Sequence, residues 1–71
     1  MNISDRLFTL YEMVQKSYDL ADRGYAAESN ELYIKAYKIA ENMLNIYEIS
    51  MFSDEELTFL NHIIKTFDYE Q

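Results

Sequence analysis

Few residues in this chain have side chains that could support catalysis or bind a metal. His62 is the only histidine, and no carboxylate or second histidine stands four residues before it to complete a metal-binding pair on a helix. The acidic run Asp54–Glu56 could bind a hard cation, but it also suits the first turn of a helix, where carboxylates stabilise the positive end of the dipole. Gly24 is the only glycine, so the sequence offers no phosphate-binding loop, and it contains no nucleophile motif. We therefore expect no enzyme activity, no metal site and no cofactor.

The elements that carry these residues are predicted to be helices. Three stretches, about residues 4–23, 26–48 and 54–67, carry hydrophobic or small residues at steps of three and four, which is the period of one helix face. The predicted core positions are Ile3, Leu7, Leu10, Val14, Ser17 and Ala21 in the first stretch; Ser29, Tyr33, Ala36, Ala40, Met43, Leu44 and Tyr47 in the second; and Leu57, Leu60, Ile64 and Phe67 in the third.

Residues typical of helix ends mark the boundaries of these stretches. Ser4 is placed to cap the first helix, and Gly24 to end it in a left-handed conformation. Ser53 followed by Glu56 three residues later predicts a capping box, and residues 68–71 are expected to form a frayed acidic tail. Because short connections join neighbouring antiparallel helices, the chain is predicted to be one all-α domain, residues 1–71, folded as an antiparallel up-down-up three-helix bundle.

Composition limits the class of partner. Thirteen acidic and six basic residues give the 71-residue chain a net charge of −7, which disfavours direct binding to nucleic acid or to an anionic membrane. The absence of cysteine excludes disulfides and thiolate metal sites, and no segment approaches the roughly 18 apolar residues of a membrane span. We therefore expect a cytoplasmic protein.

The apolar residues beside the main rows are more numerous than one small core is expected to bury. A chain of this length is stabilised only marginally by its core, and apolar side chains left exposed mark a binding surface. The expected partner-binding residues are Met13, Leu20, Leu32, Tyr37, Ile39, Ile46, Phe59 and Ile63.

Five tyrosines allow two interpretations. They can lie at the edge of the core with the ring inward, or they can form an interface, since tyrosine supplies a large rigid contact area. These residues are Tyr11, Tyr18, Tyr25, Tyr33 and Tyr47.

Two functions remain compatible with these patterns. The first is a small acidic interaction or regulatory protein, expected to be a homodimer, that binds another protein through its apolar and tyrosine-rich helix faces. The alternative is an acidic inhibitor that occludes the basic, nucleic-acid-binding surface of a regulator or enzyme.

The segment Gly24–Ala36 resembles the middle of a tetratricopeptide repeat. That family has a glycine at the turn, then a small residue five positions later, an aromatic residue nine later and an alanine twelve later, and here Ser29, Tyr33 and Ala36 occupy those positions. Lys16 and Met13 depart from the family's usual leucine and tryptophan, and the pattern occurs once, whereas a solenoid needs about three repeats. The resemblance implies a helical hairpin that binds protein.

Two fainter resemblances accompany it. The expected three helices and the glycine-aromatic-small core are similar to the microtubule-interacting-and-trafficking domain, although the third helix lacks that family's charged markers. The string Ser29-Asn30-Glu31-Leu32 is similar to the motif of small aspartyl-phosphate phosphatases, but Tyr33 stands where that family needs its aspartate. The first resemblance again implies protein binding, and the second implies a phosphatase-like hairpin.

Overall fold

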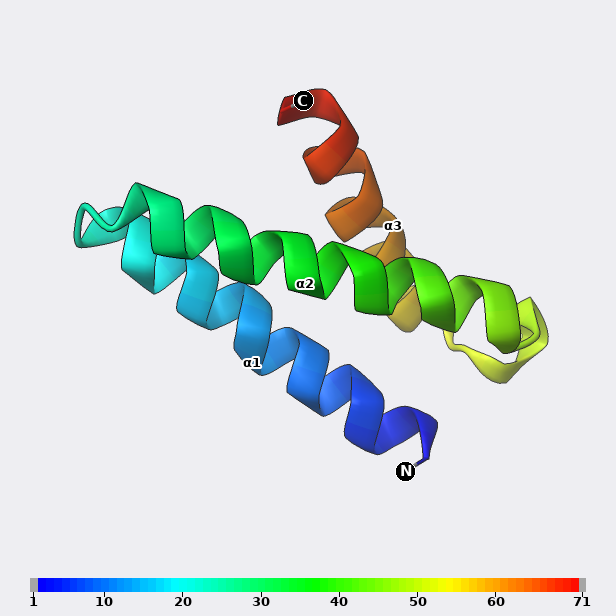
Figure 1. The fold of residues 1–71 in the computed structure, drawn as a ribbon. Helices are drawn as coiled ribbons and strands as arrows, with labels where there is room; N and C mark the ends of the chain where they lie inside the picture. Colours follow the sequence, from blue (N-terminus) through cyan, green and yellow to red (C-terminus); the bar gives the residue numbers. More distant parts are fainter. Residues whose placement is uncertain (1, 71) are drawn as a thin grey trace. The chain divides into compact units, whose positions relative to one another are not determined.

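The computed structural model describes residues 2–70, with side chains described through residue 67. It contains the helices α1 (Ile3–Asp22), α2 (Ala26–Ile46) and α3 (Asp54–Glu70), and a short 3₁₀ helix, η1 (Ile49–Met51), that precedes α3 (Figure 1). No strand occurs within residues 2–70. The expectation of an all-α fold with three helices is thus confirmed.

The chain divides into two compact units, and the division falls inside α2. The hairpin unit, Met1–Ala36, contains α1 and the first part of α2, whereas the second unit, Tyr37–Gln71, contains the rest of α2, η1 and α3. The prediction of a single domain over residues 1–71 stays a prediction, and each unit is described by itself.

The start of α1 differs from the prediction because Asn2, not Ser4, caps it. Oδ1 of Asn2 accepts a hydrogen bond from the backbone N–H of Asp5 at 2.8 Å, and the Asn2 backbone is extended, as an N-cap requires. Ser4 therefore lies in the first turn. Asparagine and serine are comparable capping residues, so sequence alone does not choose between two caps that stand two positions apart.

The end of α1 at Gly24 agrees with the prediction. Gly24 has a φ of +90° and its N–H donates to the carbonyl of Ala21 at 3.1 Å, while the N–H of Tyr25 donates to the carbonyl of Leu20 at 2.8 Å. This pair of hydrogen bonds is the Schellman motif, which satisfies carbonyls left over at the end of a helix. Arg23, the C-cap, also pairs with Asp19 at 3.1 Å, as the four-residue spacing predicts.

Replacing Gly24 with alanine is expected to lower the free energy of unfolding by about 1–2 kcal/mol, because an L side chain is strained at positive φ. A Cβ at this position meets nothing within 4 Å, so the cost comes from the backbone and not from a clash. Urea unfolding followed by circular dichroism measures the change. Gly24→Asn is the matched control, since asparagine tolerates the left-handed region and should lose less. Equal losses in the two variants would contradict this explanation.

In the hairpin unit, α1 and the first part of α2 run antiparallel and approach closely at small residues (Figure 1). Ser17 is fully buried and its hydroxyl donates to the Val14 carbonyl at 2.7 Å, and the Ser29 hydroxyl donates to the Ser17 carbonyl at 2.6 Å, which ties the helices together. The ring of Tyr18 lies against that of Tyr33, with centroids 6.2 Å apart. The buried residues of this unit, all predicted core positions, are Leu7, Leu10, Val14, Ser17, Tyr33 and Ala36.

In the second unit, the end of α2 and α3 supply the buried side chains. Tyr37 stacks on Phe67 with ring centroids 4.1 Å apart, and the Tyr37 hydroxyl donates to Oε2 of Glu41 at 2.9 Å. The buried residues of this unit are Ala40, Met43, Phe52, Leu60 and Ile63. Ala40, Met43 and Leu60 were predicted to be core residues, whereas Ile63 was expected beside the main row.

The start of α3 is the capping box that the sequence predicts. The N–H of Glu56 donates to the Ser53 hydroxyl at 3.1 Å, and the N–H of Ser53 donates to Oε1 of Glu56 at 2.7 Å. The carboxylates of Asp54, Glu55 and Glu56 all lie in the first turn, where the helix dipole favours negative charge.

Replacing Ser53 with alanine is expected to reduce the free energy of unfolding by about 1 kcal/mol, because the N–H of Glu56 loses its acceptor. Thermal and urea unfolding both measure this loss. Ser50→Ala, which removes an exposed hydroxyl in η1 outside the capping box, is the control and should change stability by much less. If both variants unfold at the same urea concentration, the capping box makes no net contribution.

Two other helix ends differ from their predicted positions. α2 ends at Ile46, two residues earlier than predicted, and η1 begins at Ile49. α3 continues to Glu70 instead of ending near Phe67, since neither glycine nor proline follows to stop it. The backbone of residues 68–70 is therefore helical, and Gln71, the last residue of the expected tail, lies outside the described residues.

Candidate protein-interaction site

The eight predicted partner-binding residues fall into three classes of exposure. Ile46 is 57% exposed and Ile63 is fully buried. The remaining six are half-buried, namely Met13, Leu20, Leu32, Tyr37, Ile39 and Phe59. Ile63 thus belongs to the core of the second unit and has no surface to offer a partner in this conformation.

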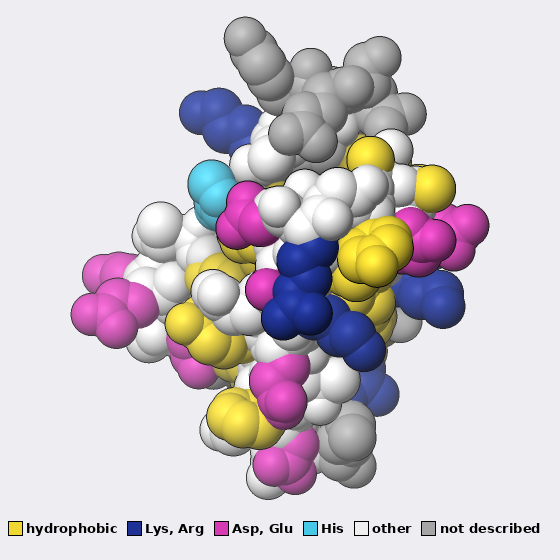
Figure 2. All heavy atoms as spheres, turned by 90° about the vertical axis from the view of Figure 1, so that its left-hand side faces the viewer, with side chains coloured by type: hydrophobic (Ala, Val, Ile, Leu, Met, Phe, Trp, Pro, Cys, Tyr) yellow, Lys and Arg dark blue, Asp and Glu magenta, His cyan; other side chains and the backbone are white. Residues whose placement is uncertain are grey.

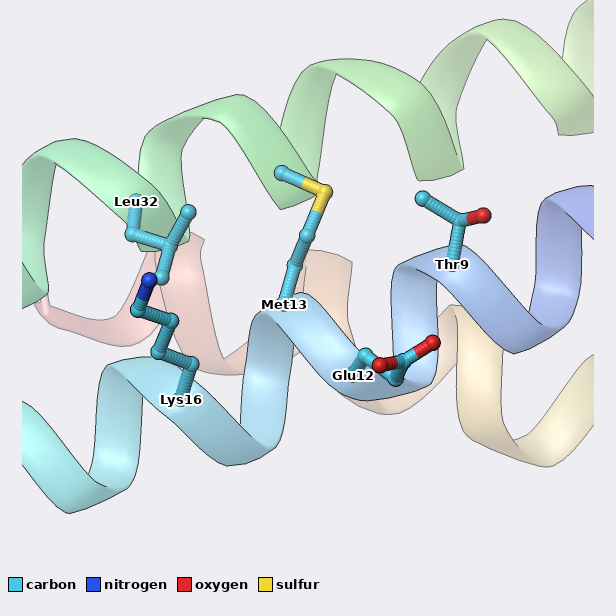
Figure 3. Close-up of a pocket in the computed structure, with 5 residues that line it drawn as sticks. All are labelled: Thr9, Glu12, Met13, Lys16 and Leu32. Atoms are coloured by element: carbon cyan, nitrogen blue, oxygen red, sulfur yellow. The ribbon is translucent and has the colours of Figure 1, made fainter.

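Met13 and Leu32 lie together in the hairpin unit, at an open hollow between α1 and α2 with a volume of about 390 Å³ (Figure 3). Figure 3 shows Met13 directed from α1 toward α2 and Leu32 directed from α2 toward α1. The hollow is also lined by Thr9, Glu12 and Lys16, all from α1. Two predicted residues from different helices are therefore brought together, whereas Leu20 does not line this hollow.

Charged side chains stand at the edges of this hollow. Lys16 rises from α1 beside Leu32, so its methylene groups cover apolar surface while the ammonium group stays near water, whereas the Glu12 carboxylate is turned away from Leu32 (Figure 3). The site therefore has an apolar base, Met13 and Leu32, between one anion and one cation. Such a site suits a partner protein whose apolar side chain is flanked by a charged residue on either side.

Four charged residues of α1 and its C-cap follow a symmetric order along one face. Asp5, Glu12, Lys16 and Arg23 are exposed and separated by seven, four and seven residues. At 3.6 residues per turn, these spacings point the four side chains within about 40° of one another. The order along the helix is two acids followed by two bases. Two copies of this face in antiparallel orientation therefore place opposite charges against each other.

Sequence reasoning missed Thr9, Glu12 and Lys16 as site residues. The four-residue spacing of Glu12 and Lys16 predicts an ion pair within one helix. Because this pair accounts for both residues, their position at the edge of a hollow was not predicted. The signal that could have found them is the symmetry of the charges about Val14.

The five tyrosines divide between the two interpretations. Tyr33 is buried and Tyr47 is half-buried, as core or core-edge residues are. Tyr11, Tyr18 and Tyr25 are exposed, although the ring of Tyr18 also contacts Tyr33. Tyr11 and Tyr18 stand seven residues apart on α1, whereas Tyr25 lies beyond the helix end at Gly24; the exposed rings leave aromatic surface for a partner.

The residues considered for catalysis or metal binding do not gather into a site. His62 is exposed on α3, and the Glu56 carboxylate is used by the capping box. Within the part of the chain that the structure describes, no three histidine or acidic side chains are close enough to hold a metal ion.

The surface mixes acidic, basic and hydrophobic side chains. On the face shown in Figure 2, acidic side chains are scattered, and basic side chains near the middle lie directly beside hydrophobic ones. None of the described helices combines the length and hydropathy needed to cross a membrane.

Comparison of the chain with models of protein families, with curated proteins and with solved structures finds no match. The resemblance to a tetratricopeptide repeat is therefore neither confirmed nor contradicted.

Proposed function

We propose that this chain is a small cytoplasmic interaction protein that acts by binding other proteins and that forms a homodimer through the exposed face of α1. The observation that carries the dimer is the self-complementary charge order of Asp5, Glu12, Lys16 and Arg23 beside the hollow at Met13 and Leu32. The resemblance of Gly24–Ala36 to a tetratricopeptide repeat supports the same class, since helical hairpins of that family bind protein.

A twofold axis at the level of Val14 makes the proposed arrangement explicit. Two antiparallel copies of α1 then place Glu12 opposite Lys16 of the second copy, and Asp5 opposite Arg23. Arg23 already pairs with Asp19 in its own chain, so the two Glu12–Lys16 pairs at the centre supply most of the electrostatic selectivity. Between these pairs, Met13 and Leu32 of each copy lose exposed apolar surface, which favours association.

The oligomeric state in solution tests the dimer. Sedimentation equilibrium of the full chain is expected to show a mass rising from the 8.5 kDa of one copy toward twice that value as the concentration increases. A mass that stays at 8.5 kDa up to about millimolar concentration, which corresponds to roughly −4 kcal/mol, would exclude the dimer.

An acidic inhibitor of a basic, nucleic-acid-binding surface is the second candidate. It is favoured by the net charge of −7, which such a surface would attract. The two candidates differ in salt response, because binding dominated by net charge weakens steeply as the Debye length shortens, whereas contact through apolar side chains does not.

A further inference from the structure

In the second unit, η1 lies in the connection between α2 and α3 (Figure 1). The end of α2 and this connection expose three apolar side chains. Ile46, Ile49 and Met51 are 57%, 67% and 55% exposed. Isolated exposed apolar residues need no explanation, but three within six residues form a concentration that is typical of a binding surface. We name these three residues the apolar turn.

The backbone of this connection is held by contacts that do not involve the exposed side chains. The N–H of Met51 donates to the Glu48 carbonyl at 2.9 Å, and the N–H of Phe52 donates to the Ile49 carbonyl at 3.1 Å. Phe52 is buried and meets Tyr47 edge-to-face, with ring centroids 6.1 Å apart. The capping box then fixes the start of α3. The apolar turn is therefore preformed, and folding does not explain why its side chains are apolar.

The charged residues that precede and follow the apolar turn in the sequence have one sign. The 23 residues from Ile39 to Asn61 contain five acidic residues and no lysine, arginine or histidine. Glu48, Asp54 and Glu55 are exposed, whereas the Glu56 carboxylate accepts a hydrogen bond within the capping box. Three carboxylates on and beside the turn are thus available to a cationic partner.

We propose that the apolar turn, with the carboxylates of Glu48, Asp54 and Glu55 around it, binds a segment of another protein that presents apolar side chains flanked by lysine or arginine. Apolar contact supplies affinity, and the carboxylates select the charge of the segment. A second copy of this chain would oppose carboxylate to carboxylate, and an anionic lipid surface or a nucleic acid would be repelled in the same way. This inference deepens the proposed function and rests on the chain acting by binding protein.

The probe is a synthetic amphipathic helical peptide of about 14 leucine and lysine residues. Its control is the same peptide with glutamate in place of lysine. Titration of the full chain, labelled with ¹⁵N and observed by NMR, should shift the amide signals of residues 46–55 with the lysine peptide and leave them unshifted with the glutamate peptide. Shifts confined to the hairpin unit, no shifts, or equal shifts with both peptides would overturn the proposal.

One pair of variants tests the apolar contact. Ile49→Ser is expected to weaken binding of the lysine peptide at least about tenfold, because the most exposed apolar side chain of the turn is lost. Phe8→Ser is the matched control, since Phe8 is 66% exposed on α1 and its loss should leave affinity within about twofold. Circular dichroism verifies that both variants are folded. Equal weakening by the two variants would contradict a site at the turn.

A second pair of variants tests the charges. Glu48→Gln with Glu55→Gln should weaken peptide binding about fivefold or more at low salt, whereas Glu28→Gln with Glu31→Gln, the same charge change on exposed residues of α2 in the hairpin unit, should have much less effect. Sedimentation and peptide titration of the natural chain separate this proposal from the dimer. If the natural chain is dimeric but does not bind the lysine peptide, only the proposal for the apolar turn fails. If it is monomeric but binds the peptide, only the dimer fails.

Discussion

Reversing the charge of Glu12 is expected to dissociate the homodimer, and reversing Lys16 in the same chain is expected to restore it. In the antiparallel arrangement, Glu12→Lys places two cations opposite each other at both symmetry-related contacts, and Lys16→Glu places two anions there. With both substitutions in one chain, each contact again joins opposite charges. Because each single reversal changes two contacts, we expect each to raise the dimer dissociation constant about tenfold or more, and the double variant to return to within about threefold of the natural chain.

Sedimentation equilibrium at low ionic strength measures these three dissociation constants. Glu28→Lys is the matched control, because it makes the same change of charge on an exposed residue of α2 that is not part of the symmetric face. Net charge alone predicts a different order. Glu12→Lys makes the net charge of −7 less negative, and Lys16→Glu makes it more negative. Opposite effects of the two single reversals on the dissociation constant, or no recovery in the double variant, would therefore refute the self-complementary face.

Truncating Leu60 to alanine is expected to cost about 2–5 kcal/mol of unfolding free energy, because the removed atoms leave a cavity as well as losing burial. Leu60 has no exposed surface and belongs to the core of the second unit, together with Met43 and Ile63. A chain of 71 residues has a total stability of roughly 4–11 kcal/mol, so this substitution alone removes a large part of it.

Urea unfolding followed by helical circular dichroism tests this expectation. Leu57→Ala deletes the same atoms from the same helix at a half-buried position and should cost less than half as much. If the two variants lose similar stability, then the packing at Leu60 is looser than its burial indicates.

Much of the fold follows from local sequence signals. The left-handed Gly24 and the capping box of Ser53 and Glu56 are each specified by a few neighbouring residues, and both form as predicted. The small residues Ser17 and Ala36 were placed in the core by spacing alone, and both are fully buried.

Other features depend on packing that sequence period does not reveal. Ile63 stands beside the predicted row of α3, yet it is fully buried, because the buried arc of this helix is rotated toward it from the expected row. Asn2, not Ser4, caps α1, because the helix starts two positions earlier than predicted and both residues are suitable caps.

The candidate site was only partly predictable for the same reason. Met13 and Leu32 were each identified as surplus apolar residues, but their meeting at one hollow depends on the pairing of α1 with α2. The apolar turn was missed except for Ile46, since Ile49 and Met51 lie in a stretch without helical period, where the pattern makes no statement about exposure.

The preformed connection after α2 also has an evolutionary consequence. Because the side chains of Ile49 and Met51 are more than half exposed, we expect folding stability alone to let serine, lysine or asparagine replace them. A mutagenised library sorted only for folded chains should therefore accept polar residues at both positions freely, whereas one sorted for binding of the lysine peptide should retain hydrophobic ones.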